Sequence, residues 1–125
     1  MAKWANDKVM DKGLEYLAAN ATRLYACGGQ PADYTEATGA KALGFSAITP
    51  GEFALVNGLA GGRRLSVPAK ADLTTTVAGL ADHFALVDMV NQELLYVTTT
   101  SAPQQTYAQN TISAPSWDVL IQDPT

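Results

Sequence analysis

Apolar residues near the start of the chain recur at the spacing of an α-helix. They stand three or four positions apart, at Met10, Leu14, Leu17, Ala18 and Ala21. This spacing places them on one helical face, and Asn6 or Asp7 can cap the helix start by accepting hydrogen bonds from backbone amides. We therefore expect residues 1–22 to form an N-terminal amphipathic helix. It either packs on the sheet or extends to a neighbouring subunit as an arm.

After residue 22 the pattern changes to short apolar runs separated by Gly, Pro, Thr and Ala, which is typical of an all-β domain. Eight runs are predicted strands: residues 23–27, 41–48, 53–57, 63–67, 73–78, 83–88, 93–100 and 117–122. We expect residues 23–125 to be a mainly β domain, either a β-sandwich or a small barrel of about eight short strands.

Four polar or glycine-rich runs are predicted loops, at residues 28–34, 49–51, 57–62 and 101–110. The run NGLAGG at 57–62 superficially resembles a phosphate-binding loop. The chain, however, has no GxxxxGK[ST] motif there and no helical pattern follows. A hairpin turn between the two flanking strands explains these glycines better.

The best-defined unit is HFALVDMVNQELLYVTT at residues 83–99, two apolar strands around a connection of hairpin length. Side chains alternate between the two faces of a strand. Phe84 and Leu86 are therefore expected opposite Ala85 and Val87, and likewise Leu94 and Tyr96 opposite Leu95 and Val97. Burial on both faces predicts a central position in the sheet for this hairpin.

Composition narrows the class of protein. The chain has 125 residues, of which 47% are hydrophobic and only 16% charged, so it suits one ordered domain and excludes a disordered chain. The low charge suggests that a partner covers some of the surface. A net charge of −4 provides no general basic field, so nucleic acid is not an expected ligand.

The sequence shows neither the apolar run of a signal peptide nor the roughly 20 apolar residues of a membrane span. We expect the protein in a cytoplasm, or assembled there into something larger, with no membrane as a partner. Cys27 is the one cysteine, which excludes an internal disulfide and a cysteine-rich zinc site. We expect it to be a small core residue.

The stretch ADHFALVD at residues 81–88 holds the one histidine of the chain between two aspartates. On a regular strand Asp82 and His83 point to opposite faces, and Asp88 lies about 16 Å from His83 at roughly 3.3 Å per residue. No nucleophile motif such as GxSxG is present. We predict no enzyme and no catalytic residues, with His83 a strand-end residue held by a local partner.

The twelve acidic residues are scattered, without the spacing of a calcium-binding EF-hand. We therefore predict no metal site and no cofactor, although a calcium ion bound by oxygen ligands stays open. Contacts with partner proteins are predicted from loop aromatics and from the one pair of adjacent arginines. These candidate contact residues are Trp4, Tyr34, Arg63, Arg64 and Tyr107. Trp117 alternates with Val119 and Ile121 and is expected in the core.

Three segments carry a resemblance to a known family. They are WANDKVMDKGLEYLAANATRLYACGGQPADYTEA (4–37), LADHFALVDMVNQELLYVTTT (80–100) and SAPSWDVLIQDP (113–124). They resemble a recurring small protein encoded among the structural genes of tailed phages and prophages. The resemblance covers most of the chain and includes no catalytic signature.

The resemblance implies a component of the virion that binds the major capsid protein or other virion proteins, as a decoration or cement protein on the outside of the capsid. It also implies a homo-oligomer that is assembled in the host cytoplasm. Three alternatives stay open. One is a structural protein of the tail or the head–tail connection. Another is a module that binds carbohydrate or a host surface through Tyr34, Tyr107 or Trp117. The third is a small hydrolase that uses His83.

Overall fold

The computed structural model of the chain describes residues 5–58 and 61–121. One α-helix, α1 (Asp7–Asn20), precedes the strands. The strands of the described residues are β1 (Arg23–Cys27), β2 (Ala42–Ala47), β3 (Ala54–Asn57), β4 (Arg63–Val67), β5 (Lys70–Thr75), β6 (Gly79–Asp88), β7 (Glu93–Thr106), β8 (Thr111–Ala114) and β9 (Trp117–Ile121). Two short helical turns, η1 (Glu36–Ala40) and η2 (Pro50–Glu52), flank β2.

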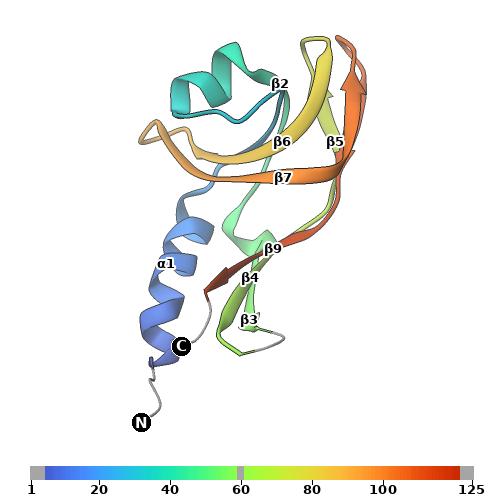
Figure 1. The fold of residues 1–125 in the computed structure, drawn as a ribbon. Coiled ribbons are helices and arrows are strands. Elements are labelled where there is room, and N and C mark those ends of the chain that lie inside the picture. Colours follow the sequence, from blue (N-terminus) through green and yellow to red (C-terminus); the bar gives the residue numbers. More distant parts are fainter. Residues whose placement is uncertain (1–4, 59–60, 122–125) are drawn as a thin grey trace.

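The strands form two antiparallel sheets. One has the order β7-β6-β1-β2-β5-β8, and the other has the order β3-β4-β9. Curved strands of the larger sheet lie at one end of the molecule, and α1 runs alongside the smaller sheet at the other (Figure 1). The predicted mainly β fold with one N-terminal helix is confirmed, in an arrangement consistent with a small β-sandwich.

Helix α1 packs on its own chain. Asn6 caps it as predicted, because its side chain accepts a hydrogen bond of 2.8 Å from the Lys8 amide. Leu14 and Leu17 are buried in the main core cluster together with Leu65 of β4 and Val119 of β9. The helix therefore contributes to the same hydrophobic core as both sheets.

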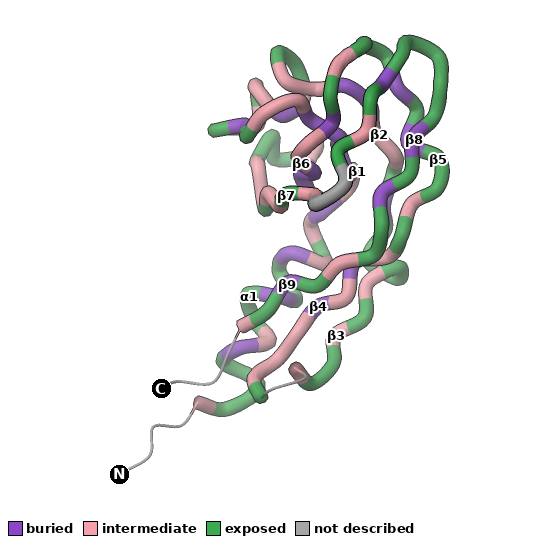
Figure 2. The backbone as a smooth tube through the Cα atoms, turned by 45° about the vertical axis from the view of Figure 1, so that its right-hand side comes forward, coloured by how far each residue is buried: buried purple, intermediate pink, exposed green. Residues whose placement is uncertain are grey.

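A second, smaller cluster covers the other face of the larger sheet. It centres on Tyr25, Cys27, Ala85 and Val87, and Ala37 of η1 closes it from outside. Because η1, in the connection from β1 to β2, packs on this face, β1 and the second half of β6 have core clusters on both sides. Figure 2 colours the tube by the burial of each residue. The sequence predicts a loop at residues 28–34, but it does not predict that the next residues form a helical turn that covers this face of the sheet.

The hairpin of β6 and β7 differs from the prediction in two ways. β6 is buried on both faces, but β7 is the edge strand of the larger sheet, so the predicted central position is wrong for the hairpin's second strand. The strand pairing also shifts, since Leu86 pairs with Tyr96 and Val87 with Leu94. The extra residue, Leu95, is a β-bulge that breaks the side-chain alternation.

As a result, Leu94 and Val97 pack against the second cluster, and Leu95 packs against the main cluster. The predicted grouping of Leu94 with Tyr96 and of Leu95 with Val97 is wrong for this reason. The corresponding prediction for β6 is confirmed, because Phe84 and Leu86 belong to one cluster and Ala85 and Val87 to the other.

The polar run at residues 101–110 is mostly strand, which corrects the predicted loop. β7 continues to Thr106, and β8 begins at Thr111. Pro103 lies in β7, where a missing amide is tolerated because an edge strand lacks one neighbour. β5 also lies earlier than the predicted strand at 73–78, at Lys70–Thr75. These segments are rich in threonine and bury only alternate residues. Their apolar pattern is therefore too weak to predict where the strands begin and end.

The hairpin turn predicted at residues 57–62 is confirmed. Asn57 of β3 pairs with Arg63 of β4, and the Gly58 amide donates to the Gly62 carbonyl at 3.0 Å. Gly61 and Gly62 have φ values of 96° and 72°, which side chains of L-residues rarely adopt. The glycines of this run therefore serve the backbone turn.

Candidate functional site

Asp82 and His83, expected on opposite faces, are in contact. His83 Nδ1 lies 2.8 Å from Asp82 Oδ1. The same carboxylate oxygen accepts a hydrogen bond of 2.8 Å from the Gly29 amide. The pairing of β6 with β7 is irregular between Ala81 and His83, so the simple alternation used for the prediction does not hold at this point.

This pair ties the start of the β1–β2 connection to β6. Hydrogen bonding to His83, and then to the Gly29 amide, holds the pKa of Asp82 below its ordinary value. Cys27 is the strand partner of His83, which places a thiol, an imidazole and a carboxylate in one neighbourhood. The prediction that strand alternation separates Asp82 from His83 is wrong, and Cys27 could not be placed beside them because it meets His83 only through strand pairing.

The thiol in this group lies in the packed interior of the protein. Cys27 is fully buried, and its Sγ lies 3.7 Å from the Ala37 carbonyl oxygen that accepts from it. Burial, and secondarily the negative charge of Asp82, raises the pKa of Cys27 to about 12, so the thiolate that attacks a substrate is scarcely populated near neutral pH. The predicted role of Cys27 as a core residue is confirmed.

Asp88, at the other end of the same strand, shapes the β6–β7 turn. Its side chain is buried and accepts hydrogen bonds from the Val90 and Asn91 amides at 2.9 and 3.2 Å and from Asn91 Nδ2 at 2.7 Å. Burial raises the pKa of Asp88, but the hydrogen bonds from Asn91 and Val90 outweigh it and leave the pKa below its ordinary value. This carboxylate has a structural role.

Within residues 5–58 and 61–121, no group of three or more His, Cys, Asp or Glu side chains is placed to hold a metal ion. In the same part of the chain, no helix has the length and apolar character to cross a membrane.

The two candidate arginines are both engaged within the chain. Arg63 Nε donates to Asp11 Oδ1 of α1 at 2.7 Å, and this ion pair joins the helix to β4. Arg64 Nη1 lies 3.2 Å from Asp118 Oδ2 on the neighbouring β9. Their side chains are 16% and 25% exposed. A contact of either arginine with a partner protein stays a prediction, and it would add to these bonds.

The candidate aromatic residues lie in separate parts of the fold. Trp4 is outside the described residues. Tyr34 packs against the second cluster, where its hydroxyl donates to Met89 Sδ at 3.2 Å. Tyr107 follows β7 and is 57% exposed. Of the predicted contact residues that the structure describes, Tyr107 is the most accessible to a partner.

Trp117 lies against the main cluster as predicted and stacks on Tyr96, with ring centroids 5.6 Å apart. Its indole Nε1 is buried and has no hydrogen-bond partner among the described residues. An unpaired buried donor carries a free-energy cost. The stacked rings connect β7, at the edge of one sheet, with β9, at the edge of the other.

Beside this stack lies an apolar hollow that the sequence did not predict. We call it the α1–β9 groove, and it has a volume of about 370 Å³. It is lined by Gly13, Leu14, Tyr16, Leu17, Leu94, Leu95, Tyr96, Val119, Leu120 and Ile121. These residues come from α1, the start of β7 and β9, and none of them is charged. The signal that could have indicated it is Tyr16, a large aromatic residue on the expected solvent face of α1.

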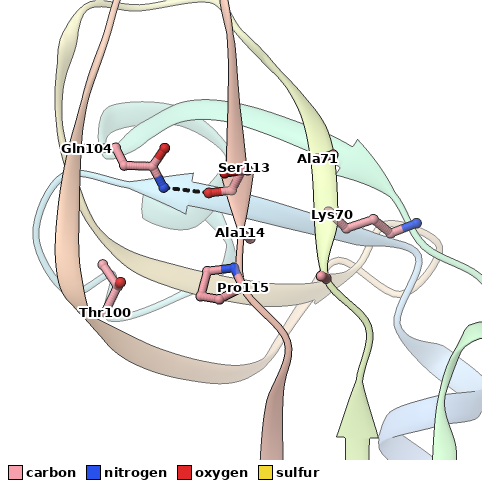
Figure 3. Close-up of a pocket in the computed structure, with 8 residues that line it drawn as sticks. Lys70, Ala71, Thr100, Gln104, Ser113, Ala114 and Pro115 are labelled. Carbon is pink, nitrogen blue, oxygen red and sulfur yellow. Dashed lines mark hydrogen bonds between the residues drawn. The ribbon is translucent and has the colours of Figure 1, made fainter.

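A second hollow, of about 530 Å³, lies between β5, β7 and β8. The Gln104 side chain on β7 donates to the Ser113 carbonyl of β8 across it, and the Lys70 side chain extends away from this bond (Figure 3). Lys70 forms an ion pair with Glu52. The Gln104 contact therefore joins β7 to β8, and the Lys70 ion pair joins β5 to η2.

No protein-family model, no curated protein and no solved structure matches the chain.

Proposed function

We propose that this chain is a non-enzymatic structural protein of a phage particle that decorates or cements the exterior of the capsid by subunit packing. The observation that carries the proposal is the α1–β9 groove, an uncharged apolar surface that is open to solvent. Such surfaces on small domains mark contacts with other macromolecules. The resemblance of the three sequence segments to small virion proteins supplies the class of particle.

The side chains that could carry chemistry have structural partners in this chain. Asp82 and His83 bind each other and the β1–β2 connection, Asp88 holds a turn, and Cys27 is buried with a raised pKa. Each of these groups is used in stabilising the fold. This supports a role that depends on a rigid surface rather than on a reaction.

The proposed partners are the major capsid protein or other virion proteins and further copies of the same chain, and the proposed location is the virion. A place in the tail or the head–tail connection is the alternative, because a contact surface alone does not distinguish these positions.

Quantitative mass spectrometry of purified particles tests the proposal. The chain is expected in a fixed ratio to the major capsid protein, in many copies per particle. Particles from a deletion of the gene are expected to lose their DNA at a lower temperature than particles that contain the chain. Absence of the chain from washed particles would overturn the proposal. A copy number near that of a tail protein would move the chain to the tail.

A further inference from the structure

We propose that Arg23 and Phe45 form a binding site for a single carboxylate, and that the occupant is an Asp or Glu side chain of another protein of the particle. The identity of this partner rests on the proposed function, whereas the carboxylate site itself does not. Three observations support the site. They are the lack of a carboxylate beside Arg23 among the described residues, the fixed orientation of its guanidinium group, and the uncharged residues around it.

Arg23 differs from the other two arginines of the chain in its partners. Arg63 is paired with Asp11 at 2.7 Å, and Arg64 is paired with Asp118 at 3.2 Å. In the described part of the chain no ion pair includes Arg23, although its side chain is only partly exposed. A partly buried cation of this kind loses hydration without gaining a charged partner. An anionic group from outside the chain supplies that partner.

Two aromatic side chains hold the Arg23 guanidinium in one orientation. Its Cζ lies 4.4 Å from the centroid of the Phe45 ring, which is a cation–π contact. Its Nη1 donates to the Tyr25 hydroxyl at 3.2 Å, and Tyr25 is buried with its ring centroid 5.4 Å from that of Phe45. A guanidinium has five N–H donors. Those that Tyr25 does not use can bind a carboxylate through two parallel hydrogen bonds, the arrangement that arginine favours.

The residues beside Arg23 on this face of the larger sheet are uncharged. Its strand partners are Val87 of β6 and Ala47 of β2, and residues directly opposite each other lie on the same face of a sheet. The exposed Asp72 is on β5, two strands from β1, which is about 10 Å at roughly 4.8 Å per strand. Solvent screens an exposed charge at that distance. Asp72 therefore does not take the place of a carboxylate in contact with Arg23.

The charge of the chain favours one protein carboxylate over a polyanion. A net charge of −4 repels the rows of phosphates that nucleic acids and anionic membranes present. Sites for such polyanions combine several cations in a patch or stripe, whereas Arg63 and Arg64 are already bound to carboxylates of their own chain. A single Asp or Glu side chain needs only one guanidinium. In the proposed role, the major capsid protein or another virion protein supplies this side chain.

An NMR titration of the isotope-labelled full chain with sodium benzoate tests the site, because benzoate joins one carboxylate to an apolar ring. Saturable shifts are expected for the Arg23 Nε–H and Phe45 ring signals. Benzamide has the same shape without the charge, and it is expected to cause no saturable shift. Arg23→Gln is expected to weaken benzoate binding by about tenfold or more, because the paired hydrogen bonds between two charged groups are lost.

Two further variants complete the comparison. Phe45→Leu removes the ring that orients the guanidinium and is expected to weaken benzoate binding by a smaller factor than Arg23→Gln does. Arg64→Gln is the matched control, because Arg64 is an arginine that has a carboxylate partner within the chain. It is expected to leave benzoate binding at Arg23 unchanged. The NMR spectrum identifies any variant that does not fold, and the comparison is then made with the other variant of the site.

The absence of saturable shifts at Arg23, or equal shifts with benzamide, would overturn the carboxylate site. So would benzoate binding that both Arg23→Gln and Phe45→Leu leave unchanged. Fluorescence anisotropy with a single-stranded DNA oligonucleotide is expected to show no binding. Binding of the oligonucleotide that Arg23→Gln removes would overturn the choice of a protein carboxylate and assign the site to phosphates.

Rebinding of the chain to particles from the gene deletion separates the site from the proposed function. Lower occupancy of these particles by Arg23→Gln than by wild type supports the named partner. Equal occupancy contradicts the partner but not a carboxylate site that binds benzoate. A wild-type chain that does not bind particles contradicts the virion role, and the benzoate titration still decides the carboxylate site. Self-association of the wild type that Arg23→Gln removes would overturn the named partner and assign the occupant to a second copy.

Discussion

Truncation of Leu14 tests whether α1 belongs to the core of its own chain. Leu14 is 2% exposed and lies in the main core cluster. Leu14→Ala removes three buried carbons, which corresponds to about 2.4 kcal/mol at about 0.8 kcal/mol each. Incomplete collapse of the cavity adds on the order of 1 kcal/mol. We therefore expect a loss of about 3 kcal/mol in the free energy of unfolding.

For a chain of 125 residues, the entropy of unfolding near the midpoint is about 0.26 kcal/mol per degree, so this loss lowers Tm by about 12 °C. Thermal unfolding followed by circular dichroism measures the shift. Val9→Ala is the control on the same helix, since Val9 is 71% exposed. It is expected to change the stability by no more than about 0.5 kcal/mol, or about 2 °C.

If α1 were instead an arm that docks on a neighbouring subunit, Leu14→Ala would change Tm little in dilute solution. Its effect would then grow with protein concentration. A shift as small as that of Val9→Ala, or one that appears only at high concentration, would refute the packing of α1 on its own sheet.

Three further predictions follow from buried polar groups. Thr106 is fully buried, and its hydroxyl donates to the Val77 carbonyl at 2.7 Å, so Thr106→Val is expected to lower the free energy of unfolding by about 1–2 kcal/mol in urea titrations; an unchanged midpoint would contradict this role. Cys27, with its pKa raised to about 12 by burial, is expected to react with a thiol reagent only after denaturation, and fast labelling of the folded chain would contradict its burial. The lowered pKa of Asp88 means that its stabilising effect is present above the pKa of about 3.9 in the unfolded chain and is lost as the pH falls through the lower folded value. Asp88→Asn is therefore expected to reduce the acid dependence of stability below about pH 4, and an identical acid transition in wild type and variant would exclude this contribution.

The sequence predicts those elements whose pattern agrees with their surroundings. Three features follow from local spacing in the sequence. They are the apolar face of α1 with its Asn6 cap, the division of the β6 side chains between two clusters, and the glycine turn before Arg63. In each case one face, or one backbone conformation, is determined by residues that are neighbours along the chain.

The remaining features depend on contacts between distant residues. The bulge at Leu95 reverses the alternation of β7, and no residue type in LLYV indicates it. The contact between Asp82 and His83 likewise depends on an irregularity of strand pairing. The α1–β9 groove brings together three segments that are far apart in the sequence. Side-chain periodicity carries no information on contacts between distant segments. For this reason the contact residues predicted from loops did not include the residues that line the groove.

The most direct test of the proposed capsid role is a difference map, from electron cryomicroscopy, between particles with and without the gene for this chain. The account predicts additional density at equivalent positions on the outer surface of the capsid. Each region of additional density is expected to fit one or more copies of a 13.2 kDa domain. Identical capsid exteriors in the two maps would contradict it.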